Sequence, residues 1–374
     1  DKYFLHKQYN AQYVVQQLQY LLLFAKPQRG CVMPELLVDD DASYARRALV
    51  VTHARLDSHS AVVNQVTTQL SSAGFHVDVF HSAAVSDFAQ KTAHVIDENT
   101  EIVVVLGGDG TMLQAAELVH CTPVPIIGIN LGHVGFLAEF ESFQIDEAIR
   151  RIAQKDYFLE HRMEAHVDVW LPGASEPLSD WALNDITLDR ADRGRMVELS
   201  IRVDNVEMSS FGCDGVIVST PTGSTAYAFS AGGPIMWPNV EALQLVPLAA
   251  HALFSRPLII GAGSTFTIDI LEDSASGGWI CCDGRRQRAL PQGSRIQIRQ
   301  SKDELFLARL SGVPFTQRLV TKFDLPVVGW RENRRKKSSK PKEYEANLHN
   351  ETDRNYEDVP NVSNNYHNPN SLNS

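Results

Sequence analysis

The sequence lacks the common signatures of nucleotide-binding proteins. It contains no Gly-Lys dipeptide, which excludes a Walker A phosphate loop, and no Gly-x-Gly-x-x-Gly fingerprint of a dinucleotide-binding fold. The His-Arg-Asp and Asp-Phe-Gly elements of protein kinases are absent as well. Any phosphoryl chemistry in this chain therefore needs a different scaffold.

The chain also has little positive charge and few cysteines. Its 374 residues carry a formal net charge of −11, so no global basic field attracts nucleic acid or an anionic membrane surface. The five cysteines are scattered, apart from Cys281 and Cys282, and none has zinc-site spacing. Residues 20–25 are too few and too poorly flanked for a signal peptide or a membrane span. We therefore expect a reduced, cytoplasmic protein with no nucleic-acid or membrane partner.

Hydrophobic periodicity divides the chain into an α/β half and a β half. Aliphatic runs separated by helix-length segments predict a parallel sheet. These runs lie at 48–52, 75–80, 102–106 and 124–129. After about residue 156, apolar and polar residues alternate, which is typical of antiparallel strands. We expect a Rossmann-like α/β domain over residues 46–155 and an all-β, sandwich-like domain over 156–311, with a cleft at their junction.

The remaining segments are predicted to be peripheral. Residues 1–45 combine apolar residues at helical spacing with several prolines, and we place no function there. Residues 312–332 are expected to pack back on the α/β domain. Nine of residues 347–374 are asparagine, so we expect residues 333–374 to be a disordered or foreign tail.

The most informative segment is Gly107-Gly-Asp-Gly-Thr111, which directly follows the aliphatic run Ile102–Leu106. Ligands bind at the carboxyl ends of parallel strands, and glycines there let the backbone approach a ligand closely. Asp109 can reach a substrate hydroxyl, and the loop amides can face a phosphate. An ordinary strand-to-helix turn with a capping Asp explains the same five residues, so the loop alone does not decide the function.

Four further segments accompany this loop. They are the glycine-rich stretch 128–137, the pair Asn184-Asp185, the hydroxyl-rich stretch 213–227 and Ser230-Ala-Gly-Gly-Pro234. Taken together, the five segments resemble the NAD kinase family over residues 46–332. The first loop is shared with diacylglycerol-type lipid kinases and phosphofructokinases, whereas 213–227 and Asn184-Asp185 point to NAD kinases.

The resemblance implies transfer of a phosphoryl group from ATP, or from inorganic polyphosphate, to the adenosine ribose 2′-hydroxyl of NAD, with NADH as an open second acceptor. It implies that Asp109 bonds this hydroxyl and acts as general base. It assigns the phosphate donor to a loop of Gly107, Gly108, Gly110 and Thr111. It assigns NAD binding to Asp109, Gly110, Phe136, Asn184, Asp185, Arg195, Gly212, Asp214, Thr222, Thr225, Ala226, Tyr227, Ala228, Phe229 and Ser230.

We expect Mg²⁺ or another divalent cation to arrive on the donor phosphates, because the sequence shows no dedicated carboxylate cage and no metal ligands. The pair His161-Arg162 is predicted to lie near phosphate, although a surface role suits His161 equally. The family resemblance implies a homodimer or homotetramer, in which Asp214 could act across subunits. Gly212 stands where some family members carry Arg, and we hypothesise that losing this cation relaxes discrimination between NAD and NADH.

Two other functions compete with this interpretation. A diacylglycerol-type lipid kinase would use the same first loop, but it would need an apolar or basic membrane face that the acidic chain does not offer. A non-catalytic NADP-binding regulator could keep the binding segments, but it would have little need for Asp109.

Overall fold

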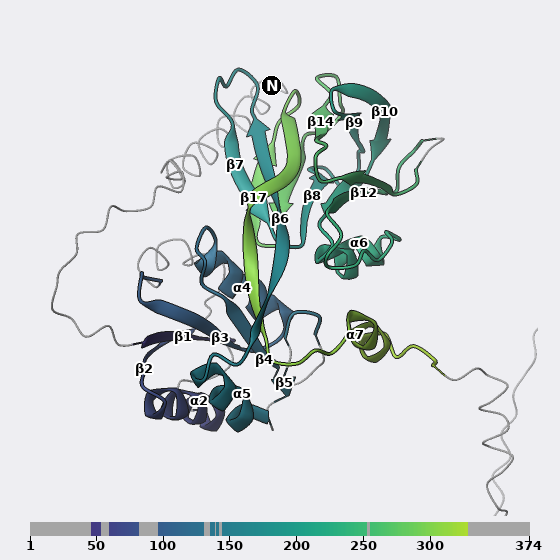
Figure 1. Ribbon diagram of the computed structural model, residues 1–374. Coiled ribbons are helices and arrows are strands. Elements are labelled where there is room, and N and C mark those ends of the chain that lie inside the picture. The colour runs from purple at the N-terminus through teal and green to yellow at the C-terminus, as the bar shows by residue number, and fades with distance from the viewer. Residues whose placement is uncertain are drawn as a thin grey trace, which may run out of the picture. The chain divides into compact units, whose positions relative to one another are not determined.

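The computed structural model describes residues 46–53, 60–81, 96–130, 135–138, 140–141, 144–252 and 255–327 (Figure 1). The predictions for residues 1–45 and 333–374 fall outside these residues. Described residues up to Leu325 belong to one compact unit. None of the described helices is long and apolar enough to span a membrane.

The α/β part contains a parallel sheet, as the aliphatic runs predict. Four strands lie in the order β2-β1-β3-β4, and each pair is parallel. Their bounds are β1 Arg46–Thr52, β2 Phe75–His81, β3 Thr100–Leu106 and β4 Ile126–Asn130, with the short β5 Phe140–Glu141 beside β4. Helices pack on both faces, namely α2 Ala61–Ser72, α4 Asp109–Val119 and α5 Ile145–Ala153. Alternate residues of β3 therefore enter two different cores: Val104 joins the α2 and α5 side, and Val105 joins the α4 side.

Helix α2 shows how the sequence sets an element's limits. The Ser60 hydroxyl accepts a hydrogen bond from the Val63 amide at 3.3 Å and caps the first turn. Val63, Val66 and Leu70 form the buried face. Gly74, with φ of +90°, follows the helix end in a conformation that favours glycine.

Six of the strands that follow residue 156 extend this same sheet, with antiparallel pairing among themselves. In the described chain the first sheet has eleven strands, in the order β10-β9-β14-β17-β4-β3-β1-β2, with β6 on β17 and β7 on β6. The added strands are β6 Phe158–Trp170, β7 Leu178–Ala182, β9 Val197–Val203, β10 Val206–Cys213, β14 Phe266–Ile270 and β17 Arg295–Arg309. β17 joins the two parts, because its residue Leu307 pairs in parallel with Ile126 of β4. Figure 1 shows β6 and β17 as the long strands that run from one part into the other.

A second sheet packs against the antiparallel part of the first. Among the described residues it has six strands in the order β13-β12-β11-β8-β15-β16. Their bounds are β8 Asp185–Arg190, β11 Gly215–Ser219, β12 Ala242–Leu248, β13 Leu258–Gly261, β15 Gly278–Cys282 and β16 Arg286–Leu290. One core contains buried residues of both sheets, such as Ile268 and Val218, so this part is a sandwich. The predicted fold class, an α/β part with a parallel sheet followed by a mostly antiparallel β part, is confirmed.

Three short elements complete the fold. A 3₁₀ turn, Gly223–Thr225, and the helix α6, Tyr227–Ser230, follow β11. Helix α7, Phe315–Lys322, follows β17 near the end of the described chain. Phe315 of α7 lies 5.9 Å from Phe136 between ring centroids, so this segment does contact the loop that follows the parallel sheet.

Candidate functional site

Asp109 is the first residue of α4 and lies at the carboxyl end of β3. Its carboxylate accepts two backbone hydrogen bonds, from the Phe136 amide at 3.1 Å and from the Leu137 amide at 3.0 Å. The two glycine-rich segments of the sequence are thus interlocked through this side chain. Each carboxylate oxygen can accept a further hydrogen bond, so a substrate hydroxyl can still be bound.

Glycines make this interlock sterically feasible. A Cβ on Gly135 would lie 2.2 Å from Oδ1 of Asp109, and a Cβ on Gly107 would lie 2.5 Å from Oγ1 of Thr111. Gly110, in contrast, is exposed, and a Cβ there would meet no atom within 4 Å. Thr111 is buried, with 3% of its surface exposed. Close packing therefore leaves no room for a side chain at positions 107 and 135, whereas the exposed Gly110 leaves the start of α4 open to a ligand.

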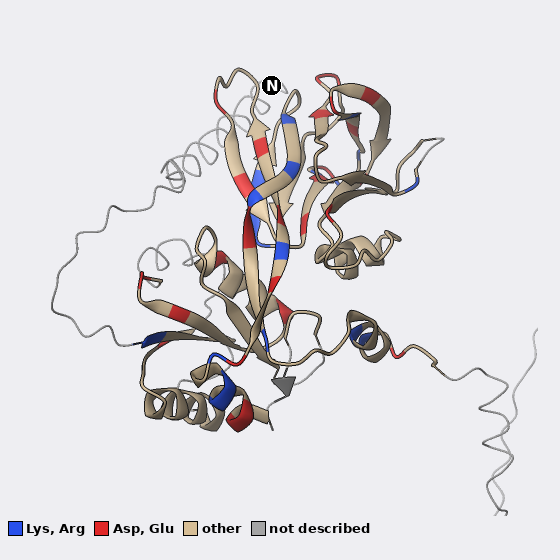
Figure 2. Cartoon of the chain, viewed as in Figure 1, with Lys and Arg blue, Asp and Glu red and all other residues tan. Residues whose placement is uncertain are grey.

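A group of charged residues contacts the Phe136–Leu137 backbone, with Arg309 fully buried and Glu160 and Arg318 half-buried. Arg309 donates to the Leu137 carbonyl at 2.7 Å and to Glu160 at 2.5 Å. Arg318 of α7 donates to the Phe136 carbonyl at 3.2 Å. Figure 2 marks basic residues of β17 and α7 in blue. Burial acts to raise the pKa of the Glu160 carboxyl, but the surrounding arginines outweigh it and hold that pKa below its usual value.

Arg162 connects this group to the hydroxyl-rich segment. It pairs with Glu160 at 2.7 Å and donates to the Thr222 hydroxyl at 3.3 Å. Burial lowers the pKa of Arg162 to about 10, so the side chain remains a cation at neutral pH. Its Nε atom is buried and has no hydrogen-bond partner among the described residues. Contacts thus run continuously from Thr222 through Arg162, Glu160 and Arg309 to the loop that holds Asp109.

Asn184 and Thr222 also lie in one locality. The Thr220 amide donates to the Asn184 carbonyl at 3.0 Å. A Cβ on Gly223 would lie 2.0 Å from the same carbonyl oxygen, so only glycine fits this close approach. The structure therefore brings together the pair Asn184-Asp185 and the turn after β11, which are far apart in sequence.

A buried aspartate shapes the Asn184-Asp185 loop. The Asp283 carboxylate accepts from the amides of Leu183 at 2.9 Å and Asn184 at 2.7 Å, and more weakly from that of Asp185 at 3.3 Å. Arg286 lies beside it, 3.4 Å away. Burial, with a smaller contribution from the charge of Asp283, raises the pKa of Asp185 to about 7. Asp185 is therefore poised to change protonation near neutral pH.

Aromatic rings link the Asp109 loop to α6. Phe323, directly after α7, lies 5.7 Å from Phe136 and 4.6 Å from Phe229 between ring centroids. Trp237 contacts Phe315 edge-on at 5.1 Å. Two predicted site residues, Phe136 and Phe229, thus share one aromatic cluster, in which Phe136 is buried and Phe229 is partly exposed.

The other residues predicted near α6 differ in exposure. Ala228 is fully buried against β11 and β12, and the Thr225 hydroxyl donates to the Thr222 carbonyl at 3.2 Å. Tyr227 is 46% exposed, and Ser230 is exposed as well, while Ala226 is half-buried. Tyr227 and Ser230 are therefore the members of this group that are most accessible to a ligand.

Asp214, Gly212 and Arg195 lie at the opposite end of β11 from Thr222. Asp214 is half-exposed and pairs with Arg190 at 3.0 Å. A Cβ on Gly212 would lie 3.4 Å from Sδ of Met196, an ordinary contact. Arg195 is exposed, and its guanidinium lies 3.8 Å from Asp192. His161 is also exposed, 2.9 Å from Glu304, so the structure separates it from the buried Arg162.

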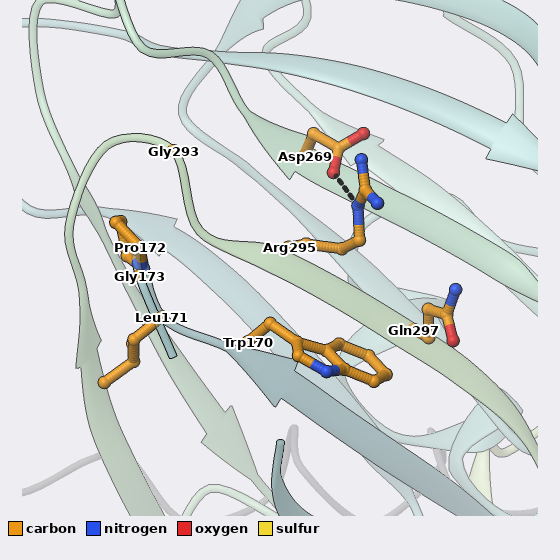
Figure 3. A pocket seen from close by; sticks show the side chains of 8 residues that line it. All are labelled: Trp170, Leu171, Pro172, Gly173, Asp269, Gly293, Arg295 and Gln297. Atoms are coloured by element: carbon orange, nitrogen blue, oxygen red, sulfur yellow. Dashed lines mark hydrogen bonds and ion pairs between the residues drawn. The ribbon is translucent and has the colours of Figure 1, made fainter. Parts of the chain in front are cut away.

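A shallow cavity of about 340 Å³ lies elsewhere, at the far end of β6 (Figure 3). Trp170 and Arg295 line it, and Arg295 is paired with Asp269 at 2.7 Å. Trp170 is ten residues along β6 from Glu160, which corresponds to about 33 Å of extended strand. This cavity is therefore remote from the Asp109 loop, and we do not regard it as the active site.

Sequence reasoning missed Glu160, Arg309 and Asp283. Asp283 and Gly284 have φ angles of +51° and +66°, which suits the Asp-Gly signal of a tight hairpin, so the turn could have been found. The role of Asp283 as an acceptor for the amides of residues 183–185 could not have been found from the sequence, because these residues are about a hundred positions away. Arg309 and Glu160 resemble ordinary solvated charges on strands, and the sequence carries no signal of their burial.

Comparison with known proteins assigns this chain to a family. Residues 36–157 match the model of the ATP-NAD kinase N-terminal domain, and residues 183–310 match that of the ATP-NAD kinase C-terminal domain. The chain is 72% identical over 294 residues to an NAD kinase of Bifidobacterium longum subsp. infantis, covering 79% of this chain and 87% of that protein. It is 50% identical over 297 residues to an NAD kinase of Leifsonia xyli subsp. xyli, covering 76% and 97%.

Solved structures agree with these matches. Yeast NADH kinase complexed with NADH has a TM-score of 0.66 at 21% identity, covering 77% of this chain and 90% of that one, and it supports the fold. An NAD kinase from Archaeoglobus fulgidus in complex with ATP has a TM-score of 0.57 at 25% identity, covering 74% and 98%. The chain therefore belongs to the NAD kinase family and is a phosphotransferase.

Proposed function

We propose that this chain transfers the terminal phosphoryl group of ATP to the adenosine ribose 2′-hydroxyl of NAD, with Asp109 as the general base. The observation that carries this proposal is the interlock of Asp109 with the Phe136 and Leu137 amides, which holds the carboxylate at the carboxyl end of β3. The NAD kinase family membership supplies the reaction. The residue roles are our inference.

In this mechanism most of the rate comes from positioning, because phosphoryl transfer has a loose transition state. Asp109 orients the ribose hydroxyl and takes its proton as the oxygen attacks phosphorus. Two fixed amides hold the carboxylate, so little reorganisation accompanies the reaction. The buried arginines behind the loop add a field that favours phosphate, because burial protects their charge from screening by salt.

We propose that NAD binds at the Asn184-Asp185 loop and the turn after β11, and that Asp214, at the other end of this fully buried strand, contacts a dinucleotide bound to a second copy of the chain. The contacts of Asn184 with Thr220 and Gly223 support a common binding surface for the ribose and adenine. The accessible Tyr227 and Ser230 lie on the same segment. In this arrangement residues 46–155 supply the base, and residues 156–311 supply most of the dinucleotide contacts.

We propose ATP as the donor, since the related Archaeoglobus fulgidus NAD kinase was solved in complex with ATP. The divalent cation would arrive with the donor phosphates. Among the described residues, the one group of three potential metal-ligating side chains lies at the far end of α4 and not at Asp109. Gly107, Gly108, Gly110 and Thr111 would then face the phosphates from the start of α4.

The central test is Asp109→Asn. The amide keeps the size of the side chain but cannot accept the proton, and its NH₂ group replaces one of the two oxygens that accept from the Phe136 and Leu137 amides. We therefore expect kcat to fall about 10²–10⁴-fold in a protein that still folds, with a lower melting temperature. Asp146→Asn is a matched control, because Asp146 occupies the first turn of α5, away from this site. Rates are scored with an NADP-specific dehydrogenase, and thermal denaturation reports the fold. Full activity in Asp109→Asn contradicts the role of Asp109 as general base.

We propose that Gly212 lets the enzyme accept NADH as well as NAD. The position is half-buried, with ordinary space around a Cβ, so a larger side chain can be introduced. We expect Gly212→Arg to raise the ratio of NAD to NADH turnover. A wild-type enzyme that already strongly prefers NAD contradicts this idea.

We also propose that the chain forms a homodimer or homotetramer. β10 is an edge strand of the first sheet and exposes Val206 at 67% and Met208 at 49%, a surface that suits a second copy. Light scattering after size exclusion measures the mass. A monomer at micromolar concentration contradicts this proposal.

A further inference from the structure

Three potential metal ligands gather at the carboxyl end of α4. His120, Cys121 and Asp303 each place a ligand atom within 4.8 Å of the others. His120 and Cys121 directly follow α4, whereas Asp303 lies on β17. The pairing of β17 with β6 shifts register between Gln300 and Glu304, and Asp303 lies within this irregularity.

A buried carboxylate lies next to this cluster. The Glu164 side chain is 1% exposed, and its Oε2 atom is 3.0 Å from Nδ1 of His120. Neither atom has another hydrogen-bond partner among the described residues. Glu164 is therefore placed to orient the imidazole and to compensate the charge of a cation bound to it.

The imidazole plane is fixed by a neighbouring ring. His120 stacks on Trp181 with centroids 4.0 Å apart and an angle of 7° between the planes. The ring is therefore held before any ion arrives. Coordination through Nε2 leaves Nδ1 to donate to Glu164, whereas coordination through Nδ1 brings Glu164 into the ligand set.

We propose that His120, Cys121 and Asp303, supported by Glu164, form a binding site for a divalent transition metal of the Zn²⁺ class. The nitrogen, sulfur and oxygen ligands suit Zn²⁺ better than Mg²⁺, which prefers oxygen alone. Binding replaces the thiol proton of Cys121, which is released to solvent. The position after the carboxyl end of a helix also favours a cation.

The proposed ion has a structural role, because it ties the end of α4 to the irregular part of β17. Asp109 is at the other end of α4, about 16 Å away along the helix axis, so the ion does not take part in phosphoryl transfer. Cysteine spacing in the sequence does not reveal the site, because Asp303 is 182 residues from Cys121.

The test is Co²⁺ and Zn²⁺ binding to the full chain after chelator treatment and dialysis. We expect one Co²⁺ per chain with a near-ultraviolet thiolate-to-cobalt band, displaced by Zn²⁺. Cys121→Ser should lose the band and bind at least about tenfold more weakly, and Glu164→Gln should weaken binding about 10–100-fold. Cys31→Ser, a matched thiol control, should bind like the wild type.

A rise in melting temperature with Zn²⁺ in the wild type, absent in Cys121→Ser, supports the structural role. NAD kinase activity and circular dichroism confirm that each variant is folded. A wild-type chain with no band at micromolar Co²⁺, a band that persists in Cys121→Ser, or one that disappears in Cys31→Ser overturns the proposal. These outcomes are independent of whether Asp109 is the catalytic base.

Discussion

Gly135→Ala tests whether the interlock of Asp109 with the 135–137 loop matters for the reaction. The new methyl group would lie 2.2 Å from Oδ1 and 2.8 Å from Cγ of Asp109, well inside the 3.0 Å that real Cβ contacts respect. Either the aspartate rotates away or the loop moves back. In both cases the hydrogen bonds from the Phe136 and Leu137 amides are lengthened or lost.

The size of the effect follows from those two bonds. Each is a hydrogen bond to a charged group and contributes about 1.5–3 kcal/mol, so losing both costs about 3–6 kcal/mol before the loop relaxes. Displacing the proposed general base removes a contribution of about 10²–10⁴ to the rate. We therefore expect kcat to fall about 10²-fold or more, together with a lower melting temperature.

The assay compares initial rates of NADP formation from NAD and ATP with thermal denaturation of the same samples. Gly312→Ala is the matched control, because a Cβ at that position would meet no atom within 4 Å and its backbone does not require glycine. If the Gly135→Ala enzyme is folded and retains kcat within about threefold, Asp109 does not need this interlock, and the reasoning is wrong.

Two further predictions concern buried charge. The pKa of Asp185 is raised to about 7, so the native state keeps a proton that the unfolded chain loses near pH 4. The bound proton stabilises the native state fully below about pH 4. This stabilisation, at most about 4 kcal/mol, is lost as the pH rises to about 7. The melting temperature of Asp185→Asn should therefore fall less between pH 5 and pH 8 than that of the wild type, and parallel profiles contradict this expectation. Arg309→Met removes one of the two arginines paired with Glu160 and leaves the buried Leu137 carbonyl without this donor, so it should lower the free energy of unfolding by about 1–3 kcal/mol in urea titrations. A loss well below about 1 kcal/mol would falsify the role given to Arg309.

Local pattern predicted the α/β part of the fold well. Ile102–Leu106 is aliphatic at every position because both faces of β3 are covered, and this uninterrupted run distinguishes it from the alternating Val197–Val203 of β9. The junction was not predictable in the same way. The sequence of residues 295–309 carries no signal that Leu307 pairs with Ile126, because strand pairing depends on partners far away in the chain.

Residues of the candidate site could be predicted where short segments have a distinctive composition. Residues whose role depends on burial in the folded chain could not be predicted. Asp109 and the Asn184-Asp185 pair stand out because glycines and polar residues end apolar strands. Arg309 is 1% exposed, yet an arginine at the end of a strand normally indicates a solvated edge. Its burial depends on Glu160 and the Leu137 carbonyl, which only the folded chain brings within reach.

One peptide group explains why Arg318 and Asp109 should act together. The carbonyl of Phe136 accepts from Arg318, and the amide of the same peptide unit, on Leu137, donates to Asp109. A cation at the oxygen polarises the peptide and strengthens the hydrogen bond at its nitrogen. Arg318 is on α7, whose residue Phe315 also contacts Phe136, so the orientation of the Asp109 carboxylate depends on a residue 182 positions beyond Phe136. Damage to α7 should therefore lower kcat, and it should also raise the KM for NAD, because Phe136 and Phe229 of the proposed dinucleotide site contact this segment.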